Sequence, residues 1–494
     1  MHRIMIAAAL GMAGLTGCEP QQQAPIAQVH KHELPIGQHE KLLDGSFDDW
    51  GPGEFGNADG RWIWIRFAPN ARPTQAIQAS DRITRVRIDA DMNSSTGVEM
   101  PVPPTGGEAI MAQPQGVDLL LEYSPLNEAG GIGIGMRVTG YNADGTGETM
   151  GHAEIGAACL PTYASDQYEL RIDRLAPGSG VLPESGWVDV IVEQVDVDGK
   201  MLWSDRQSIE LPARDASPAE TDVMLGERAA EGVRVMSANV LFSSPLTNPD
   251  AFERILRATK PDVILYQEWF RTERGKVEAW VSEHAGPEWS LHFPDERAGV
   301  AIATRHPIVA RYEEALPPSG DGRPARACAA LIDTDAGELL AISVHLKCCG
   351  GAGSEEDLTR IDQAKAINGF IAWVHEQHPD AMVVIAGDFN LVGSRAPLEV
   401  MARGLGVGGD DMDAALTPVL GDSSVVTWVD EKSMFGPGRL DWLLYDDSRS
   451  ELVDAYMLNT RVLTDTALER LGLERDDSKA SDHLPMVVDL VRLD

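Results

Sequence analysis

The sequence predicts a multidomain chain in which an all-β sandwich precedes an α/β domain. Short β-type runs separated by Gly, Pro, Asn and Asp clusters continue to about residue 211, and strand-like runs alternate with helical stretches beyond about residue 232. The length of 494 residues and the 43% hydrophobic content suffice for two cores. They exclude a disordered, collagen-like or simple coiled-coil chain.

The first residues predict an export signal. His2 and Arg3 precede an apolar run that is too short to span a bilayer, and the run ends in Leu-Thr-Gly-Cys at Cys18. Residues 1–18 resemble a bacterial lipoprotein signal peptide with its lipobox, which implies that Cys18 carries a lipid. We therefore expect an exported, membrane-anchored lipoprotein of the outer membrane, periplasm or cell surface. An ordinary secretory signal with an incidental cysteine is the alternative. Residues 19–40, polar and rich in Pro and Gln, are predicted to form a tether.

Residues 41–211 are predicted to form the β-sandwich. The β-type runs are RWIWIRF, ITRVRIDADM, VDLLLEY, IGIGMRVTGY, DQYELRID and WVDVIVEQV. Short strands punctuated by turn residues are typical of antiparallel sheets packed face to face. The region loosely resembles the β-sandwich modules found beside sugar-binding and adhesion domains.

A candidate calcium site lies inside this β-sandwich. Asp89, Asp91 and Asn93 occupy alternate positions before Gly97, so three oxygen side chains can converge on one Ca²⁺ if the chain turns there. A solvated acidic turn is the alternative, because a complete EF-hand loop is absent.

The boundary between the two domains is predicted at residues 212–231, which are rich in Pro, Ala and charge and lack a strand pattern. In the α/β domain, residues 232–494, apolar strand-like runs alternate with helical segments, including 249–259 and 354–377. Ser354 and Asp357 have capping-box spacing at the start of the longer helix.

Polar residues follow the apolar runs of the α/β domain with unusual regularity. The runs deliver, in chain order, Asn239, Glu268, His345, Asp388 with Asn390, Asp441, and Asp482 with His483. An unpaired polar group at the end of an apolar strand costs stability, so this recurrence predicts one shared site at a sheet edge.

These residues, in this order, resemble those of the endonuclease/exonuclease/phosphatase superfamily, which has a deoxyribonuclease I-like and exonuclease III-like fold. The motifs are Asn239, Gln267-Glu268, His345, Gly387-Asp388-Phe389-Asn390, Asp441 and Ser481-Asp482-His483. The resemblance covers residues 232–494. It implies a four-layer α/β sandwich, with two central β-sheets flanked by helices, and metal-dependent hydrolysis of a phosphate ester.

The chemistry of that reaction explains the residue types. A phosphodiester anion repels hydroxide, so the enzyme must neutralise charge on the phosphoryl oxygens and aim a water in line with the leaving oxygen. Glu268, a hard oxygen ligand, is expected to bind Mg²⁺ (or Mn²⁺) with help from Asn239. Asp482 is expected to be a further ligand or a neighbour of the ligands.

The remaining motif residues are expected to move protons and hold the phosphate. By the family pattern, Asp441 is the partner of the His483 imidazole. Asp388 and Asn390 lie two apart on an extended segment and face the same way, one to orient or deprotonate water and the other to hold the phosphate. His345 is expected to donate to a non-bridging oxygen. The general base is either Asp388 or His483.

Basic residues near these motifs are candidate substrate contacts. Arg326 and Arg360 are expected to contact phosphate or to support residues that do. Lys347, two residues after His345, is expected to approach the substrate phosphate. The next residues, Cys348 and Cys349, form either a vicinal disulfide or two buried thiols, and their adjacency does not suit a tetrahedral zinc site.

The net charge of −36 bears on the substrate. An acidic chain repels polyphosphate and lacks the basic patch of a dedicated nucleic-acid binder, so nucleic acid is disfavoured without being excluded. The sequence predicts a lipid-anchored, metal-dependent phosphoesterase that cleaves phosphodiester or phosphomonoester bonds, with nucleic acid and phospholipid or sphingomyelin as alternative substrates. The rival prediction is a surface binding or adhesion protein with an inactive enzyme-like domain.

Overall fold

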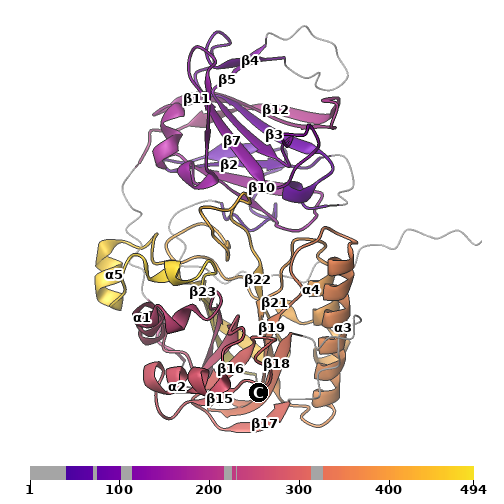
Figure 1. Cartoon of the computed structure of the whole chain (residues 1–494), viewed down its shortest axis with the longest axis vertical. Coiled ribbons are helices and arrows are strands. Elements are labelled where there is room, and N and C mark those ends of the chain that lie inside the picture. The colour runs from indigo at the N-terminus through magenta and orange to yellow at the C-terminus, as the bar shows by residue number, and fades with distance from the viewer. Residues whose placement is uncertain are drawn as a thin grey trace, which may run out of the picture.

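The computed structural model describes residues 41–69, 75–101, 114–215, 225–229, 231–312 and 326–493. Figure 1 shows two bodies stacked along the long axis, an N-terminal one built from strands and a C-terminal one in which helices cover sheets. The predicted signal peptide with Cys18 and the predicted tether lie outside the described residues. Within the described part of the chain, no helix is both long and apolar enough to cross a bilayer.

The N-terminal β region, residues 41–211, is built from antiparallel strands. Its strands are β1 Gly56–Ala58, β2 Trp62–Phe67, β3 Ile83–Asp89, β4 Val98–Met100, β5 Gln115–Val117, β6 Leu119–Tyr123, β7 Met136–Tyr141, β8 Gly147–Met150, β9 Ala158–Leu160, β10 Tyr168–Asp173, β11 Gly186–Val195 and β12 Met201–Leu211. One sheet has the order β1-β2-β10-β9, a second has the order β12-β11-β3-β6-β7-β8, and β4 pairs with β5. A single hydrophobic cluster draws on both larger sheets, for example on Ile65 and Leu170 of the first and Val86 and Leu121 of the second.

The C-terminal region contains two six-stranded sheets. Its strands are β13 Gly232–Asn239, β14 Val263–Gln267, β15 Ser290–His292, β16 Ala301–Thr304, β17 Ile308–Tyr312, β18 Ala327–Thr334, β19 Gly337–His345, β20 Met382–Asp388, β21 Asp413–Ala414, β22 Asp441–Tyr445, β23 Ser450–Met457 and β24 Met486–Arg492. The first sheet has the order β15-β16-β14-β13-β24-β23 and the second the order β17-β18-β19-β20-β22-β21. β13 runs parallel to β14, and β19 runs parallel to β20.

Helices cover the outer faces of these two sheets. They are α1 Pro249–Thr259, α2 Arg274–His284, α3 Glu355–His375, α4 Ala396–Ala402 and α5 Asp465–Leu471. The first sheet shares a hydrophobic cluster with α1, α2 and α5, and the second shares one with α3 and α4. The inner faces of the two sheets meet in a third cluster. The layers are therefore helices, sheet, sheet and helices, in agreement with the predicted α/β architecture.

Burial on both faces explains the continuous apolar runs of the sequence. In β19, Leu339 and Ala341 pack between the sheets, while Leu340 and Ile342 pack under α3 and α4. A strand with two buried faces needs apolar residues at consecutive positions. The predicted helix start is confirmed, because the Ser354 side chain accepts a hydrogen bond from the backbone N of Asp357.

Candidate active site

The functional side chains gather at one edge of the two central sheets, where strands end or begin. Asn239, His345 and Asp388 are the last residues of β13, β19 and β20, and Glu268 directly follows β14. Because β13 and β14 are parallel, as are β19 and β20, the carboxyl ends within each pair reach the same edge. Asp441 begins β22, which runs antiparallel to β20, so Asp441 lies opposite Asp388. Strand direction thus brings together motifs that are far apart in the sequence.

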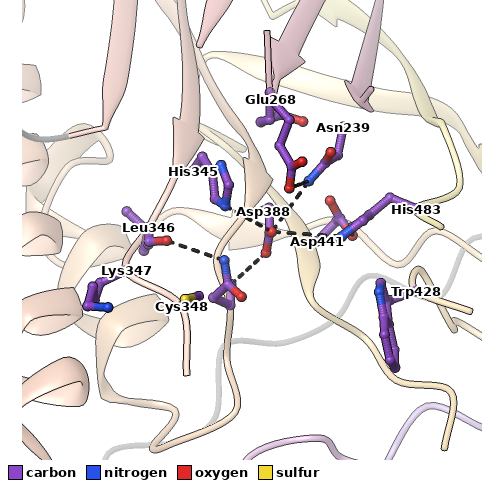
Figure 2. A network of polar contacts seen from close by, with 12 residues as sticks. Asn239, Glu268, His345, Leu346, Lys347, Cys348, Asp388, Trp428, Asp441 and His483 are labelled. Carbon is purple, nitrogen blue, oxygen red and sulfur yellow. Dashed lines mark hydrogen bonds and ion pairs between the residues drawn. The ribbon is translucent and has the colours of Figure 1, made fainter. Parts of the chain in front are cut away.

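Three of these side chains form a group that can hold a metal ion. Ligand atoms of Glu268, His345 and Asp388 all lie within 4.8 Å of one another, and all three residues are buried (Figure 2). Glu268 Oε1 accepts a hydrogen bond from Asn239 Nδ2 at 3.1 Å, and Oε2 accepts one from the backbone N of Phe242 at 3.0 Å. Two buried carboxylates beside an imidazole form a donor set that fits a divalent cation such as Mg²⁺ or Mn²⁺.

Asp388 also joins a second set of polar contacts (Figure 2). Its Oδ2 lies 3.4 Å from His345 Nε2 and 3.9 Å from His483 Nε2. His483 Nδ1 lies 2.7 Å from Asp441 Oδ2, the pairing that the family pattern implied. Asp388 Oδ1 accepts a hydrogen bond from the backbone N of Asn390 at 2.9 Å. Asp388 therefore lies between the metal-binding group and the His483–Asp441 pair.

Burial and neighbouring charges shift the protonation of these groups in different directions. Burial, helped by the charges of Arg326 and His483, lowers the pKa of His345 to about 3, so this imidazole is neutral at pH 7. Burial alone would also lower the pKa of His483. The negative charges of Asp441 and, to a lesser extent, Asp388 outweigh burial and raise this pKa to about 10. Burial raises the pKa of Asp388 to about 8 against the charge of His483, and a bound cation would act in the opposite direction. The site thus combines one neutral and one charged imidazole around the Asp388 carboxyl group, which a bound cation would favour as the carboxylate.

The backbone is specialised where these side chains emerge. Glu268 and Asn390 have φ values of 68° and 49°, in the left-handed region that non-glycine residues rarely adopt. Gly387 has a φ of 145°, and a Cβ there would lie 2.0 Å from a carbonyl oxygen of β19 and 2.9 Å from Gln267 Nε2. Gln267 itself connects the two sheets by donating to Ser343 Oγ at 3.0 Å. The glycine before Asp388 is therefore required by the close approach of the chain segments at this edge.

Asp482 is placed differently from its neighbours in the motif set. It lies outside the group formed by Glu268, His345 and Asp388. Its Oδ2 accepts a hydrogen bond from the Trp428 indole at 2.9 Å, whereas its Oδ1 is buried without a hydrogen-bond partner in the described part of the chain. Of the two expected roles, further ligand or neighbour of the ligands, this position fits the neighbour, because the indole holds the carboxylate to the side.

Arg326 and Lys347 lie next to the site. The Arg326 guanidinium carbon lies 5.6 Å from the centroid of the Phe270 ring, and its charge acts on His345. The backbone N of Lys347 donates to Gln363 Oε1 at 2.9 Å, and Figure 2 shows Lys347 at the border of the polar network. Both positions suit a contact with a bound phosphate ester.

Arg360 does not offer a surface to a substrate, which corrects its prediction as a substrate-binding residue. It is completely buried, and its Nη1 donates to the carbonyl oxygens of Lys347 and Cys349 at 2.8 and 2.6 Å. Arg360 therefore supports the loop that follows His345. In that loop, Cys348 and Cys349 are free thiols, with Sγ atoms 2.9 Å apart, so the structure contains thiols and not the vicinal disulfide. The prediction that they are buried is wrong, because Cys348 is half-buried and Cys349 is exposed.

Several residues at the site were not singled out from the sequence. Thr427 Oγ1 accepts hydrogen bonds from the backbone N atoms of Leu440 and Asp441 at 2.8 and 3.0 Å. Trp428, the next residue, holds Asp482, and the Phe270 ring packs on His345 with centroids 5.4 Å apart. Thr427 and Trp428 lie in a loop without regular periodicity, and their partners are distant in sequence. Of these residues, only Phe270 could have been found from the sequence, because it lies two residues after the motif residue Glu268.

In the N-terminal β region, the structure adds Asp118 to the candidate calcium site that was predicted from Asp89, Asp91 and Asn93. Ligand atoms of Asp89, Asp91 and Asp118 lie within 4.8 Å of one another. Asn93 stays beside them, and its backbone N donates to Asp89 Oδ1 at 3.2 Å and to Asp91 Oδ1 at 3.0 Å. The turn predicted there is present, and calcium remains an expectation for it.

Comparison with known proteins identifies a family model that matches the part of the chain that contains this site. The family model described as Endonuclease/Exonuclease/phosphatase family matches residues 236–483. A search of the curated proteins gave no match.

Solved structures are similar over about half of the chain. A beta toxin from Staphylococcus aureus has 16% identity and a TM-score of 0.35, with 52% of this chain and 99% of that chain covered. A truncated TDP2 from Caenorhabditis elegans has 16% identity and a TM-score of 0.38, covering 54% of this chain and 100% of that chain. TDP2 from D. rerio, complexed with a single-strand DNA product, has 17% identity and a TM-score of 0.37, covering 52% of this chain and 98% of that chain.

Proposed function

The chain belongs to the endonuclease/exonuclease/phosphatase family, and from that premise we propose that it hydrolyses phosphodiester or phosphomonoester bonds with the help of Mg²⁺ or Mn²⁺. The observation that carries the proposal is the convergence of Glu268, His345 and Asp388 within 4.8 Å, next to the His483–Asp441 pair. Phosphate-ester hydrolysis needs groups that hold a cation, a group that accepts a proton, and donors for the phosphoryl oxygens.

Glu268 and Asp388, with Asn239 beside them, are the residues that would hold the cation. When bound, such a cation neutralises charge on the phosphoryl oxygens and makes a bound water more acidic. The hydrogen bonds from Asn239 and Phe242 orient the Glu268 carboxylate, so little reorganisation is needed at this ligand.

We assign the proton transfer to Asp388 and not to His483, because a bound cation would lower the pKa of Asp388 from about 8 and leave its carboxylate free to accept a proton at pH 7. The His483 imidazole carries its charge at pH 7 because Asp441 stabilises it, and a charged imidazole has no lone pair to accept a proton. His483 instead stabilises the negative charge that builds on the phosphoryl group. His345, neutral at pH 7, donates a hydrogen bond to a non-bridging oxygen, and Asn390 holds the phosphate.

The proposed substrate is a phosphate ester of low total charge. The chain carries a net charge of −36, and Arg326 and Lys347 are the predicted basic contacts at this edge that remain available. These two basic side chains suit a substrate with a single phosphate group better than a long duplex, because binding of a duplex depends on many phosphate contacts. Rates on single-stranded DNA, duplex DNA, RNA, sphingomyelin and phospholipids, measured side by side, would separate the nucleic-acid and lipid classes.

The direct test uses the full chain and bis(p-nitrophenyl) phosphate. We expect release of p-nitrophenol in Mg²⁺, its loss in EDTA, and its loss in Glu268→Gln. Glu278→Gln, the same change on an exposed position of α2, is the matched control and should keep the wild-type rate. Turnover that survives both EDTA and Glu268→Gln would contradict the assigned mechanism.

We also propose that the chain is exported and anchored through a lipid on Cys18, on the support of the amino-terminal sequence alone. Labelling of cells with an alkyne analogue of palmitate should mark the wild-type protein and not Cys18→Ser. Cys159→Ser, which changes a buried cysteine of the β region, is the control and should remain labelled. Equal labelling of all three proteins would rule out Cys18 as the lipid site.

A further inference from the structure

The loop of residues 415–440, which we call the bridging loop, contacts the catalytic motifs on one side. Thr427 Oγ1 accepts a hydrogen bond from the backbone N of Asp441 at 3.0 Å, and the Thr427 carbonyl accepts one from Leu484 N at 2.7 Å. Trp428 Nε1 donates to Asp482 Oδ2 at 2.9 Å. Figure 2 shows Trp428 on the same side of the network as His483. Two adjacent loop residues thus hold the chain on both sides of the His483–Asp441 pair.

The other side of the bridging loop is bonded to the N-terminal β region. Leu43 forms a bridge with the loop, donating to the carbonyl of Ser423 at 2.9 Å and accepting from Val425 N at 3.0 Å. Arg171 of β10 makes a two-pronged ion pair with Asp422, with Nη1–Oδ1 and Nη2–Oδ2 distances of 2.8 and 2.9 Å. Only 7% and 8% of these two side chains are exposed. Such a buried, bidentate pair fixes geometry and tolerates the loss of a partner poorly.

Further contacts extend along the same loop. Gln78 Oε1 accepts a hydrogen bond from Gly436 N at 2.7 Å, and Thr162 Oγ1 accepts one from Arg439 N at 2.7 Å. Leu43 and Leu160 also belong to the hydrophobic cluster between the two catalytic sheets. Domains within one chain are expected to move relative to each other unless the interface between them is large and hydrophobic. Here the β region completes the core of its neighbour.

We propose that the N-terminal β region is a structural part of the active site, and that Arg171 is a positioning residue for it. Arg171 holds Asp422, and the bridging loop transmits this constraint through Thr427 and Trp428 to Asp441, Asp482 and His483. The inference rests on the proposed function for its activity readout. It goes beyond the family match, which begins at residue 236 and contains none of the β region.

The test compares Arg171→Met with Arg87→Met in the full chain. Arg87 makes an equally buried ion pair with Glu193 inside the β region, where 6% and 0% of the side chains are exposed. Among the described residues, its guanidinium donates to Glu193 and to the carbonyl oxygen of Pro101, both of the β region. We expect Arg171→Met to lower kcat on bis(p-nitrophenyl) phosphate at least about 10-fold, and Arg87→Met to change it less than about 3-fold. The Mg²⁺ dissociation constant should be unchanged in both, because Glu268, Asn239 and Asp388 are held by the ends of β14, β13 and β20 and by hydrogen bonds that do not involve the bridging loop.

A second comparison, between Arg171→Met, Trp428→Phe and the double variant, tests whether Arg171 positions the active site or only stabilises the fold. Trp428→Phe keeps an aromatic ring at this position and removes the indole N–H donor, and we expect it to lower kcat to a similar extent. If Arg171 acts through Trp428, the double variant is no slower than the slower single variant, whereas independent structural damage gives multiplied losses. Hydrogen exchange should speed up in residues 415–440 and 481–484 of Arg171→Met, and not in those segments of Arg87→Met.

The outcomes separate this proposal from the proposed function. If the wild-type chain turns over substrate and the two arginine variants behave alike, or the losses multiply, the positioning role is wrong and the phosphoesterase stands. If the wild-type chain has no turnover, the proposed function is wrong, and hydrogen exchange still decides whether Arg171 holds the loop.

Thr162→Val is the substitute if Arg171→Met fails to fold, because it removes one hydrogen-bond acceptor at the same interface. We expect it to lower kcat by about 2–5-fold. An unchanged kcat in Thr162→Val would overturn the positioning role.

Discussion

The candidate active site has two halves that are held in different ways. The metal-binding half consists of Glu268, His345 and Asp388, and the imidazole half consists of His483 and Asp441. The carboxylate of Glu268 receives hydrogen bonds from Asn239 and from Phe242, all from the β13 and β14 edge. The imidazole of His483 depends on Asp441 from the other sheet, and the chain around that pair is bonded to the bridging loop. Both halves draw on both sheets, since the metal-binding group joins Glu268 of the first sheet to His345 and Asp388 of the second. The difference is that the chain around the His483–Asp441 pair is also bonded to the bridging loop and, through it, to the N-terminal β region.

The largest effect is expected at Asp388, because it belongs to the metal-binding half and lies next to His483 of the imidazole half. Asp388→Asn keeps the size of the side chain and removes its charge and its capacity to accept a proton. We expect kcat/KM to fall by about 10⁴-fold or more, since a cation site and a proton acceptor are lost together. Asp380→Asn, an exposed position before β20, is the control and should stay near the wild-type value. A loss at Asp388 of less than about 10-fold would break the view that the two halves meet there.

Asp441→Asn tests the imidazole half alone. It leaves a hydrogen-bonding partner for His483 but removes the charge that raises the pKa of that imidazole. We expect kcat to fall by about 10²–10³-fold with little change in Mg²⁺ affinity measured by calorimetry. Glu268→Gln should show the reverse pattern of affinity, with weak Mg²⁺ binding. If Asp441→Asn weakens Mg²⁺ binding as strongly as Glu268→Gln, the two halves are one unit.

Arg360→Met tests the loop that follows His345 and contacts Asp388 and Asn390 through Leu346. Arg360 is completely buried and pairs with Asp357 at 3.0 Å, so its removal leaves a buried carboxylate without its ionic partner, held by hydrogen bonds from the backbone N atoms of Gly353 and Ser394. We expect the free energy of unfolding to fall by about 3–5 kcal/mol and kcat to fall by about 10-fold. Chemical denaturation and steady-state kinetics measure the two effects. Lys365→Met, which removes an exposed ion pair of α3 with Asp362, is the control and should lower stability by less than about 1 kcal/mol.

The smallest effect concerns pH and lies at the interface, next to Leu43. Burial, with help from the charge of Asp49, raises the pKa of Asp44 to about 6 against the hydrogen bond from Ser46 and the charge of Arg439. The folded state thus binds this proton more tightly than the unfolded state, for which the pKa is about 3.8. The stability gained is present below pH 4 and is lost as pH rises through 6.

Asp44→Asn should therefore flatten the pH dependence of the unfolding midpoint between pH 4 and pH 7. Thermal unfolding at several pH values measures this, and Asp48→Asn, a nearby exposed position, is the control. An unchanged slope in Asp44→Asn would show that Asp44 titrates normally in the folded chain. It would also remove one distinctive feature of the interface that holds the imidazole half.

Patterns along the chain were enough to predict much of this architecture. Consecutive apolar residues in β14 and β20 indicated strands buried on both faces, and Ser354 marked the start of α3. The polar residues that end these strands were predicted to share one edge, and the structure brings Glu268, His345 and Asp388 together there. Such predictions succeed because strand direction and alternation place side chains without reference to distant contacts.

Contacts between distant segments were not predictable in this way. Arg360 was expected either to contact phosphate or to support residues that do, and only tertiary packing, which buries it beneath the loop after His345, excludes the first role. Asp482 was a candidate ligand, and the Trp428 indole holds it to one side. Asp118 joins Asp89 and Asp91 only because separate strands meet in one sheet. In each case, the partner is set by loop and sheet packing, for which local sequence carries no period.

The amino-acid sequence by itself determined the two-part organisation, the sheet edge where chemistry-bearing residues gather, and the family. Local propensity and periodicity are written in short stretches of chain, and they suffice for these features. The tertiary structure alone decided which polar groups are buried, which imidazole is charged, and that a loop between β21 and β22 bonds the N-terminal β region to His483 and its partners. Those properties depend on electrostatic and packing contacts between residues such as Arg171 and Asp422, which only the folded chain brings within hydrogen-bonding distance.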